Sequence, residues 1–297
     1  MPKRMLTPAL ATLAITLTLS ISVQAGATRT FVSTIGSDTN TSANCSPAAP
    51  CRTFAAALSV TNSGGEIVVL TSGGYGPATI TQSVIIIAIG VDASISQPTF
   101  GQNAITINTS GNVTLIGLNL HGEGSGAAGV LVTQVGFLRL YNMLIENFVS
   151  YGVGFDAGGD LEISGSSMND NQGNGLTVFP NASANAYVRN TSFSGSMAGV
   201  AVLGGHVTVA DSSAEFNSIG FYSEPGTLML ENDRVMFNNV GLAAVGNLYF
   251  ANCFIANNTY WYNIDTGTIA GTNPGTSFIA PGQITSGGAL STPITLQ

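Results

Sequence analysis

The chain has 297 residues, of which only 7% are charged, and its fifteen acids outnumber its seven bases to give a net charge of −8. This balance argues against nucleic acid as a partner, because phosphates require a basic surface. It also disfavours tight binding of acidic polymers such as pectate and favours neutral or cationic partners. The hydrophobic content of 44% is too high for a disordered chain.

The first 25 residues have the pattern of a secretory signal peptide. Lys3 and Arg4 supply a positive start, an apolar stretch rich in threonine runs from Leu6 to Ile21, and Val23-Gln-Ala25 is a small-x-small cleavage site. We therefore expect residues 1–25 to be removed and the protein to be extracellular, periplasmic or attached to the cell surface. No later segment approaches the roughly 20 apolar residues that span a bilayer, so no membrane span is expected in the mature chain.

Three cysteines follow this segment. Cys45 and Cys51 flank a Ser-Pro-Ala-Ala-Pro loop, and export makes a disulfide between them the expected state. The loop is short, so the bond would fix a local turn. Cys253 lies in an apolar run and is expected to be a buried small hydrophobic residue.

The next segments indicate an N-terminal cap followed by strands. Residues 53–60 predict one short helix, with Thr53 as its N-cap and with Phe54 and Leu58 on one face. Such a helix would close the exposed end of a stack of strands. Apolar runs predict buried parallel strands at 67–70, 84–87 and 105–107.

From residue 111 onward a degenerate repeat dominates the sequence. Each copy opens with a glycine and any residue, followed by an apolar-x-apolar triplet. The gaps between copies run from about 19 to 27 residues, the length of one turn of a β-solenoid. The copies begin at Gly111, Gly136, Gly159, Gly205, Gly226 and Gly246, with Ala186-Tyr-Val188 as a weaker member.

Two further positions recur in each copy of the repeat. A second glycine, followed by an apolar residue, comes about 13 to 18 residues after the first apolar position, and a third apolar position lies between them. Three short strands per turn would each direct one apolar column into a shared core, which stacking at about 4.8 Å per turn buries. The glycines are expected to permit turns with positive φ. We expect about ten turns in a single-stranded parallel β-helix.

Asparagines recur after the first and second strands of each turn. Stacked amide side chains hydrogen-bond from one turn to the next, so we interpret these columns as ladders that hold the turns together, with ligand contact as the alternative. The first column contains Asn142, Asp211, Asn232 and Asn252, and the second contains Asn147, Asn171, Asn217, Asn238 and Asn258.

The repeat stops after Asp265. Tyr260-Trp-Tyr262 aligns with the third strand of the preceding turn, which predicts that Tyr262 points inward and that Trp261 occupies the turn. We favour a hydrophobic plug for the last turn, with an aromatic sugar platform as the alternative. The expected organisation is a signal peptide at 1–25, a β-helix domain with its cap at 26–265, and a tail at 266–297.

Three segments near the N-terminus carry a further pattern. They are a strand from Phe31 leading into Gly-Ser-Asp38-Thr-Asn40, Pro50-Cys-Arg-Thr53 at the start of the helix, and Gly65-Glu-Ile with Gly74-Tyr-Gly76. Together they resemble the opening of secreted right-handed parallel β-helix proteins of the pectin-lyase-like superfamily.

With the repeat, the resemblance covers essentially the whole mature chain, and it implies an all-β, right-handed solenoid. It implies little about activity, because the superfamily includes polysaccharide lyases, glycoside hydrolases, esterases, epimerases, phage tailspikes, adhesins and proteins without known activity.

A pectate lyase of this fold would hold Ca²⁺ with clustered carboxylates and would abstract a proton with arginine or lysine. The densest acidic group in this sequence consists of Asp156, Asp160, Glu162 and Asp170. Arg139 and Arg189 are placed at the strand position of Glu162, one turn before and one turn after it, which predicts an Arg-Glu-Arg ladder. We interpret it as a surface ion-pair stack. The alternative is a shallow saccharide groove with Glu162 as acid or base, the only case in which Ca²⁺ is expected.

Other catalytic patterns are weaker. A glycosidase of this fold requires a tight set of acids, and the sequence contains no Asp-Asp pair. Asp211, Asp233 and Arg234 approach the Asp and Arg set of an esterase but lie at a turn, so we expect them to stabilise that turn. His121 and His206 are far apart and have no metal-ligand spacing, so neither a metal site nor a cofactor is expected.

Phe137, Tyr187 and Tyr249 occupy outward strand positions and are the expected contacts for a saccharide. The scarcity of catalytic residues favours a secreted or surface-associated protein that binds extracellular or cell-surface polysaccharide. One alternative is a polysaccharide lyase or hydrolase, whose candidate catalytic residues are Asp156, Asp160, Glu162, Arg139 and Arg189. Another is an adhesive or assembly module. The sequence predicts no particular oligomeric state.

Overall fold

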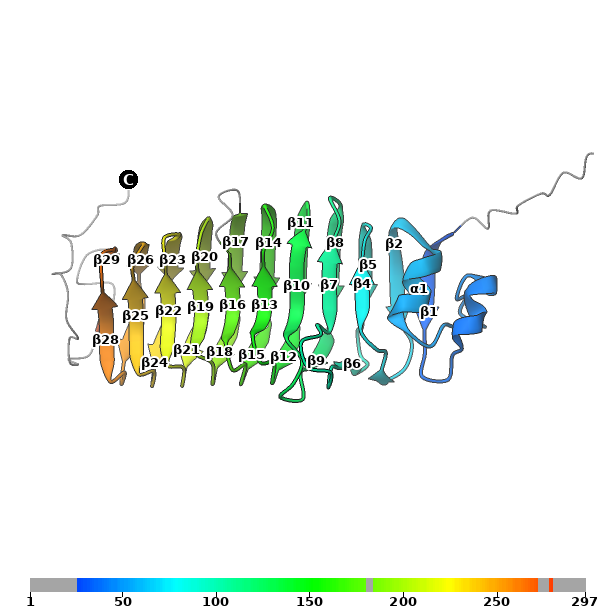
Figure 1. Cartoon of the computed structure of the whole chain (residues 1–297), viewed down its shortest axis with the longest axis horizontal. Helices are drawn as coiled ribbons and strands as arrows, with labels where there is room; N and C mark the ends of the chain where they lie inside the picture. Colours follow the sequence, from blue (N-terminus) through cyan, green and yellow to red (C-terminus); the bar gives the residue numbers. More distant parts are fainter. Residues whose placement is uncertain (1–25, 180–183, 272–277, 280–297) are drawn as a thin grey trace, which may run out of the picture.

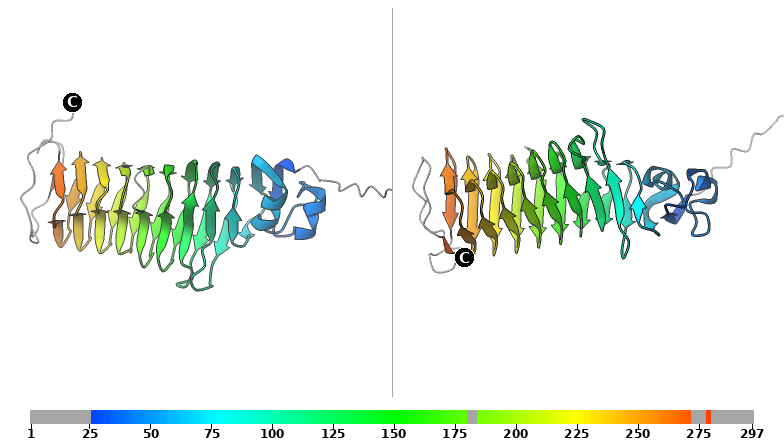
Figure 2. Two further views of the ribbon diagram at one scale, coloured as in Figure 1. Left: turned by 45° about the horizontal axis from the view of Figure 1, so that its top comes forward. Right: turned by 90° about the horizontal axis from the view of Figure 1, so that it is seen from below.

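The computed structural model describes residues 26–179, 184–271 and 278–279, which form one elongated right-handed parallel β-helix (Figure 1). A regular turn winds through three strands, and each strand pairs in parallel with its counterparts in the adjacent turns. Figure 2 shows the result as three long sheets that run along the axis, here named sheets I, II and III in the order in which a turn visits them. The predicted fold class is confirmed, whereas the predicted signal peptide lies outside the described residues.

Sheets I, II and III contain eleven, ten and nine strands. The strands of sheet I are β1 (Ala27–Val32), β2 (Thr61–Val69), β5 (Val84–Ile87), β8 (Asn112–Ile116), β11 (Phe137–Tyr141), β14 (Gly159–Ser164), β17 (Ala184–Arg189), β20 (His206–Ala210), β23 (Thr227–Glu231), β26 (Asn247–Ala251) and β29 (Thr268–Gly271). The strands of sheet II are β3 (Gly73–Gly74), β6 (Ala93–Ser96), β9 (Leu118–His121), β12 (Leu144–Glu146), β15 (Ser167–Asn169), β18 (Ser192–Ser194), β21 (Ser213–Glu215), β24 (Arg234–Met236), β27 (Phe254–Ala256) and β30 (Phe278–Ile279). The strands of sheet III are β4 (Ala78–Ile80), β7 (Ile105–Asn108), β10 (Ala128–Gln134), β13 (Tyr151–Phe155), β16 (Asn174–Val178), β19 (Ala198–Val202), β22 (Ile219–Ser223), β25 (Val240–Ala244) and β28 (Tyr260–Ile264).

The apolar triplets of the repeat form the core columns of sheet I. Leu138, for example, pairs with Val113 of the preceding turn and with Leu161 of the next, and all three side chains are buried. Because successive residues of a strand face opposite sides, this register also fixes the residues between the apolar positions on the outer face.

The corner between sheets I and II turns on a single residue in the left-handed backbone conformation. Asn and Asp, together with Gly, adopt this conformation at the lowest cost, so backbone geometry explains the first asparagine column. Five Asn or Asp residues, with φ between 48° and 59°, and two glycines take this position: Asn142, Asn190, Asp211, Asn232, Asn252, Gly117 and Gly165.

The second asparagine column forms the predicted ladder inside the helix. Oδ1 of Asn238 accepts a hydrogen bond from the amide of Asn217 at 2.9 Å, and its Nδ2 donates to Oδ1 of Asn258 at 3.0 Å. Asn171 accepts a backbone amide in the same way in an earlier turn. Asn147 does not belong to this column: it adopts φ of 61° one residue earlier, where the corner requires a left-handed residue.

The glycines at the second position of the regular sheet III strands, from β10 to β25, allow close backbone approach. A Cβ on Gly199 would lie 2.6 Å from the carbonyl oxygen of Gly220 in the next turn, and the same holds for Gly175 against Gly199 at 2.7 Å. None of these glycines has a positive φ. The expectation that glycines permit turns with positive φ is therefore wrong for these sheet III glycines, because they lie within strands whose neighbouring backbones leave no room for a side chain. It is confirmed at Gly159 and Gly205, which open copies of the repeat with φ of 107° and 68°.

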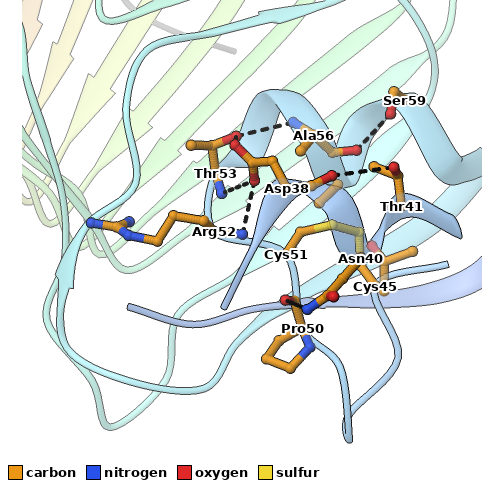
Figure 3. Close-up of a disulfide and its surroundings, with 12 residues drawn as sticks. Asp38, Asn40, Thr41, Cys45, Pro50, Cys51, Arg52, Thr53, Ala56 and Ser59 are labelled. Atoms are coloured by element: carbon orange, nitrogen blue, oxygen red, sulfur yellow. Dashed lines mark hydrogen bonds between the residues drawn. A yellow bond between two sulfur atoms is a disulfide. The ribbon is translucent and has the colours of Figure 1, made fainter. Parts of the chain in front are cut away.

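The N-terminal end is closed by α1 (Phe54–Val60), with Thr53 as its N-cap as predicted. Oγ1 of Thr53 accepts the amide of Ala56 at 3.2 Å. Asp38, at the start of the 3₁₀ helix η1 (Asp38–Ala43), accepts the amides of Arg52 and Thr53 at 2.9 and 3.0 Å (Figure 3). None of the helices in the described residues is long and apolar enough to cross a membrane.

The predicted disulfide between Cys45 and Cys51 is present in this cap, and both cysteines are fully buried (Figure 3). Nδ2 of Asn40 donates to the carbonyl of Pro50 at 2.8 Å within the same loop. Further along, the buried ring of Tyr75 packs against the ring of Phe54 with centroids 5.2 Å apart. The residues that resemble the superfamily opening thus hold the cap together.

Aromatic side chains fill the core near the C-terminal end of the helix. Trp261 and Tyr262 on β28 are 9% and 4% exposed, and their ring centroids lie 4.0 Å apart. The inward orientation of Tyr262 is confirmed, but Trp261 lies within the strand and not at a turn, at the position that glycine takes in earlier turns. The sheets run on past Asp265, where the sequence places the end of the repeat, because β29 pairs with β26.

Candidate functional site

The outer face of sheet I carries the charged cluster that the sequence predicts. The strand register places Arg139 directly beside Glu162. Arg189 lies opposite Ser164, and Tyr187 takes the position beside Glu162. The predicted register of Arg189 is therefore wrong by two residues, because Arg189 follows the weak apolar triplet of its turn whereas Glu162 lies within its own.

Glu162 is nonetheless the centre of the cluster. Its Oε2 accepts the phenolic hydroxyl of Tyr141 at 2.9 Å, while its Oε1 lies 3.3 Å from Nη2 of Arg189. Nε of Arg139 lies 3.8 Å from Oε2. Burial and the hydrogen bond to Glu162 raise the pKa of Tyr141. Both arginines remain partly exposed, so each ion pair contributes little to stability and serves chiefly to orient the side chains.

The three aromatic residues predicted to contact a saccharide lie on this face but do not form one line. Tyr187, 44% exposed, shares the central column with Tyr249, three strands further along. Phe137 lies in the neighbouring column, opposite Asp160, and the guanidinium of Arg139 sits 3.6 Å from its ring centre. Since a cation already covers one face of Phe137, Tyr187 offers the more accessible ring.

The four acids considered for Ca²⁺ do not come together. Asp160 and Glu162 lie on sheet I, Asp156 follows β13 of sheet III, and Asp170 occupies the corner after β15. Asp160 accepts a hydrogen bond from Nδ2 of Asn185 at 3.3 Å. Within residues 26–179, 184–271 and 278–279, no group of three or more His, Cys, Asp or Glu residues could hold a metal ion.

Asp233, one of the acids considered for an esterase, is buried just after the corner between sheets I and II. Its Oδ1 accepts the amide of Ser212 at 2.8 Å, and its Oδ2 accepts the amide of Glu231 at 3.1 Å. Burial raises the pKa of Asp233 to about 7, although both backbone hydrogen bonds oppose the shift. Arg234 pairs with Glu215 at 3.3 Å, and the two backbone hydrogen bonds of Asp233 agree with the expected stabilisation of this turn.

The two histidines lie on different sheets. Nδ1 of His121 on sheet II is 2.9 Å from Oε1 of Glu146 in the next turn. His206 is exposed on sheet I, in register with Asn185. Neither histidine belongs to the cluster around Glu162.

A hollow on the outer face of sheet III was not predicted from the sequence. It has a volume of about 570 Å³ and is lined by Tyr222, Ala243, Asn263 and Asp265 among others. The register places Ala243 between Tyr222 and Asn263 on consecutive strands, so a small residue between two larger ones forms the floor. Alignment of the third strands of successive turns would reveal this pattern.

Comparisons with known proteins agree with this architecture. A family described as "Right handed beta helix region" matches residues 56–219, more than half of the chain. The crystal structure of pectate lyase Pel9A is similar with a TM-score of 0.51 and 17% identity, covering 89% of this chain and 79% of its own. A structure described as ORF18 of Geobacillus virus E2 has a TM-score of 0.44 and 12% identity, with coverages of 72% and 51%. No curated protein matches the sequence.

At these identities the solved structures indicate the fold alone. The family match covers most of the cap helix and the turns that carry the cluster around Glu162, and the three-sheet architecture agrees with it. The chain therefore belongs to the right-handed β-helix family.

Proposed function

We propose that the protein is secreted and binds an extracellular or cell-surface polysaccharide along the outer face of sheet I. One observation carries this proposal: the exposed ring of Tyr187 lies beside Glu162, whose carboxylate is held by Tyr141 and two arginines. An exposed aromatic ring offers a flat apolar surface with a polar edge, and the planar charged groups around it offer hydrogen bonds to hydroxyls.

The placement of this cluster favours a neutral polymer. Asp160 and Glu162 lie among Arg139 and Arg189, so donors and acceptors are interspersed and no single sign of charge dominates. All four side chains stand on paired strands of a long sheet, which holds them in a fixed arrangement before the ligand arrives.

Secretion is supported by the signal-peptide pattern of residues 1–25 and by the disulfide of the cap. Disulfides form and persist in oxidising compartments, which agrees with an exported protein.

The test is a glycan array probed with the mature chain, with and without Ca²⁺, followed by affinity measurements on each hit. Tyr187→Ala is compared with Met229→Ala, because both residues stand in the same outer column of sheet I with exposures of 44% and 40%. We expect Tyr187→Ala to weaken binding at least about fivefold and Met229→Ala to leave it unchanged. Equal binding by the two variants would place the saccharide elsewhere.

A lyase or hydrolase is the second candidate, and the clamping of Glu162 between Arg139 and Arg189 favours it. Each bound glycan is therefore incubated with the protein and searched for new reducing ends or unsaturated products. Product that disappears with Glu162→Gln would replace the binding proposal with an enzymatic one. Absence of any glycan binding would instead favour an adhesive or assembly module.

A further inference from the structure

Two phenylalanines occupy a backbone position that does not suit them. Phe216 and Phe237 lie at the corner between sheets II and III in consecutive turns, with φ of 59° and 57°. A bulky residue in the left-handed region is a clear exception. The same corner after β12, β15, β18 and β27 holds residues that tolerate this conformation, namely Asn147, Asp170, Gly195 and Asn257. The backbone would therefore be satisfied by asparagine at both positions.

Burial of the two rings does not offset this backbone strain, because both rings remain exposed. Phe216 is 63% exposed and Phe237 is 45% exposed, yet their rings are stacked, with centroids 5.2 Å apart and planes inclined by 8°. A residue that strains its backbone and leaves its ring in water does not serve the core, and backbone strain of this kind concentrates at functional sites. The pair forms an aromatic step on an otherwise polar corner.

The turn before Phe216 leaves space beside this step. Gly195 has no side chain. The carboxylate of Asp170, which belongs to the preceding turn, lies against Gly195, close to where a Cβ of residue 195 would be. Asp170 thus lies two turns before Phe216 along the corner, and its carboxylate reaches the intervening turn, where residue 195 has no side chain to separate it from Phe216. Asp170 is exposed and takes part in none of the ion pairs of the described residues.

Charge along this corner is acidic. Glu146 and Glu215 end the sheet II strands β12 and β21, and Asp170 lies just beyond β15; Glu146 is 2.9 Å from His121. Arg234 is the one arginine on the described strands of sheet II, and it is paired with Glu215 at 3.3 Å. The arginines of the cluster around Glu162 lie on sheet I. A ligand that meets an aromatic face and an unpaired carboxylate here should carry positive charge.

From this juxtaposition we propose that the corner between sheets II and III is a second saccharide site, specific for a chain of amino sugars with free, protonated amines. A pyranose ring stacks on the Phe216/Phe237 step, and its ammonium group pairs with the carboxylate of Asp170. The side chains of Asn169 and Ser194, which hydrogen-bond each other at 3.0 Å on the adjoining strands, offer partners for the hydroxyls. This site differs from the one on sheet I in position and in the charge of its ligand.

The first test compares binding of a glucosamine hexamer and an N-acetylglucosamine hexamer to the mature protein by calorimetry at pH 6. Acetylation removes the charge and retains the ring, so we expect the glucosamine hexamer to bind at least about fivefold more tightly. Equal affinities, or no binding of the glucosamine hexamer, would overturn the proposal.

The second test uses Phe216→Asn and Phe237→Asn, which place in each corner the residue that other turns use. We expect each variant to lose glucosamine binding at least about fivefold while its melting temperature stays the same or rises, because the backbone strain is relieved. A lowered melting temperature with unchanged affinity would show that the rings serve the fold and would refute the site.

The third test removes the carboxylate with Asp170→Asn, with Asp211→Asn as the matched control. Both residues are exposed and left-handed, with φ of 52° and 51°, but they lie at different corners of the helix. We expect only Asp170→Asn to weaken binding of the glucosamine hexamer, and to do so less at high salt. Equal effects of the two variants would indicate a general charge attraction and contradict the site. Tyr187→Ala should leave binding of the glucosamine hexamer intact. This variant therefore distinguishes a failure of the corner site from a failure of the proposed site on sheet I.

Discussion

The backbone amide of Ser212 donates a hydrogen bond to Oδ1 of the buried Asp233 at 2.8 Å. In other turns, the position that Asp233 takes holds a residue with a hydroxyl or thiol group. That group donates a hydrogen bond to the carbonyl oxygen two residues earlier. These residues are Ser166, Thr191, Ser212 and Cys253. Asp233 instead accepts a second amide, from Glu231, so this buried column acquires a negative charge when Asp233 ionises.

The stability of the protein should fall as the pH rises through the range in which Asp233 ionises. Burial raises its pKa from 3.8 to about 7, so between these values the folded state holds a proton that the unfolded state has lost. The protonated Asp233 carboxyl therefore contributes about 2 to 4 kcal/mol to the free energy of unfolding. This contribution is fully present below about pH 4 and is lost as the pH approaches 7. Asp233→Ser should be more stable than the wild type at pH 8, with the difference shrinking toward pH 4. Urea unfolding at both pH values measures this, and an unchanged pH dependence in the variant would contradict it.

Asn238→Ala should destabilise the helix strongly. The side chain is 2% exposed and connects three turns, so its loss leaves the amide of Asn217 and the carbonyl of Ala214 without their partners in a dry interior. We expect a loss of about 2 to 4 kcal/mol in the free energy of unfolding. Asn239→Ala is the control, since Asn239 is the next residue and is exposed, and it should change stability by less than about 0.5 kcal/mol. Comparable losses of unfolding free energy in both variants would show that the hydrogen bonds of the asparagine ladder are not the cause.

Gly199→Ala should disrupt the stacking of sheet III. The new Cβ would lie 2.6 Å from the carbonyl oxygen of Gly220 and 3.1 Å from Cβ of Phe193, and a backbone oxygen cannot move aside without shifting a whole strand. We expect a cost of more than about 2 kcal/mol. At Gly74 the nearest atom to an added Cβ is 3.8 Å away, so Gly74→Ala should be tolerated. Thermal melts of both variants measure the difference, and a tolerated Gly199→Ala would mean that the sheets adjust more freely than their packing indicates.

Asp38→Ala should loosen the N-terminal cap. The carboxylate accepts the amides of Arg52 and Thr53 and the hydroxyl of Thr53 at 3.1 Å, which orients the start of α1. We expect a loss of about 1 to 2 kcal/mol and faster hydrogen exchange in α1. Asp156→Ala removes an exposed acid far from the cap and serves as the control. Unaltered exchange in α1 would indicate that the disulfide and Tyr75 hold the cap without Asp38.

The apolar triplets were sufficient to predict the fold, because their spacing fixes both the parallel register and the inward face of each strand. Leu138 and Leu161 pair as their triplets imply, and Thr53 caps the helix that the local sequence indicates. Both features depend on short-range patterns that one turn repeats.

The parts that escaped prediction depend on contacts between turns. The position of Arg189 required the register of a weak triplet, and the role of Gly199 required knowledge of the carbonyl one turn away. The strained backbone of Phe216 could not be predicted either. Only alignment of the turns at this corner shows that asparagine takes the equivalent position elsewhere. Outer-face chemistry is set by neighbours about 20 or more residues distant, which local periodicity does not encode.

The parallel pairing of each strand with the next turn also determines how the chain can fold and change in length. Since partners from β2 onward are separated by only about 20 to 30 residues, each added turn closes a loop of similar size and entropic cost. Folding can then begin at any adjacent pair of turns and extend in both directions. For the same reason a whole turn can be gained or lost between the cap and the buried aromatic pair of β28 without altering the pairing of the others, so the length of the outer face of sheet I can vary independently of its chemistry.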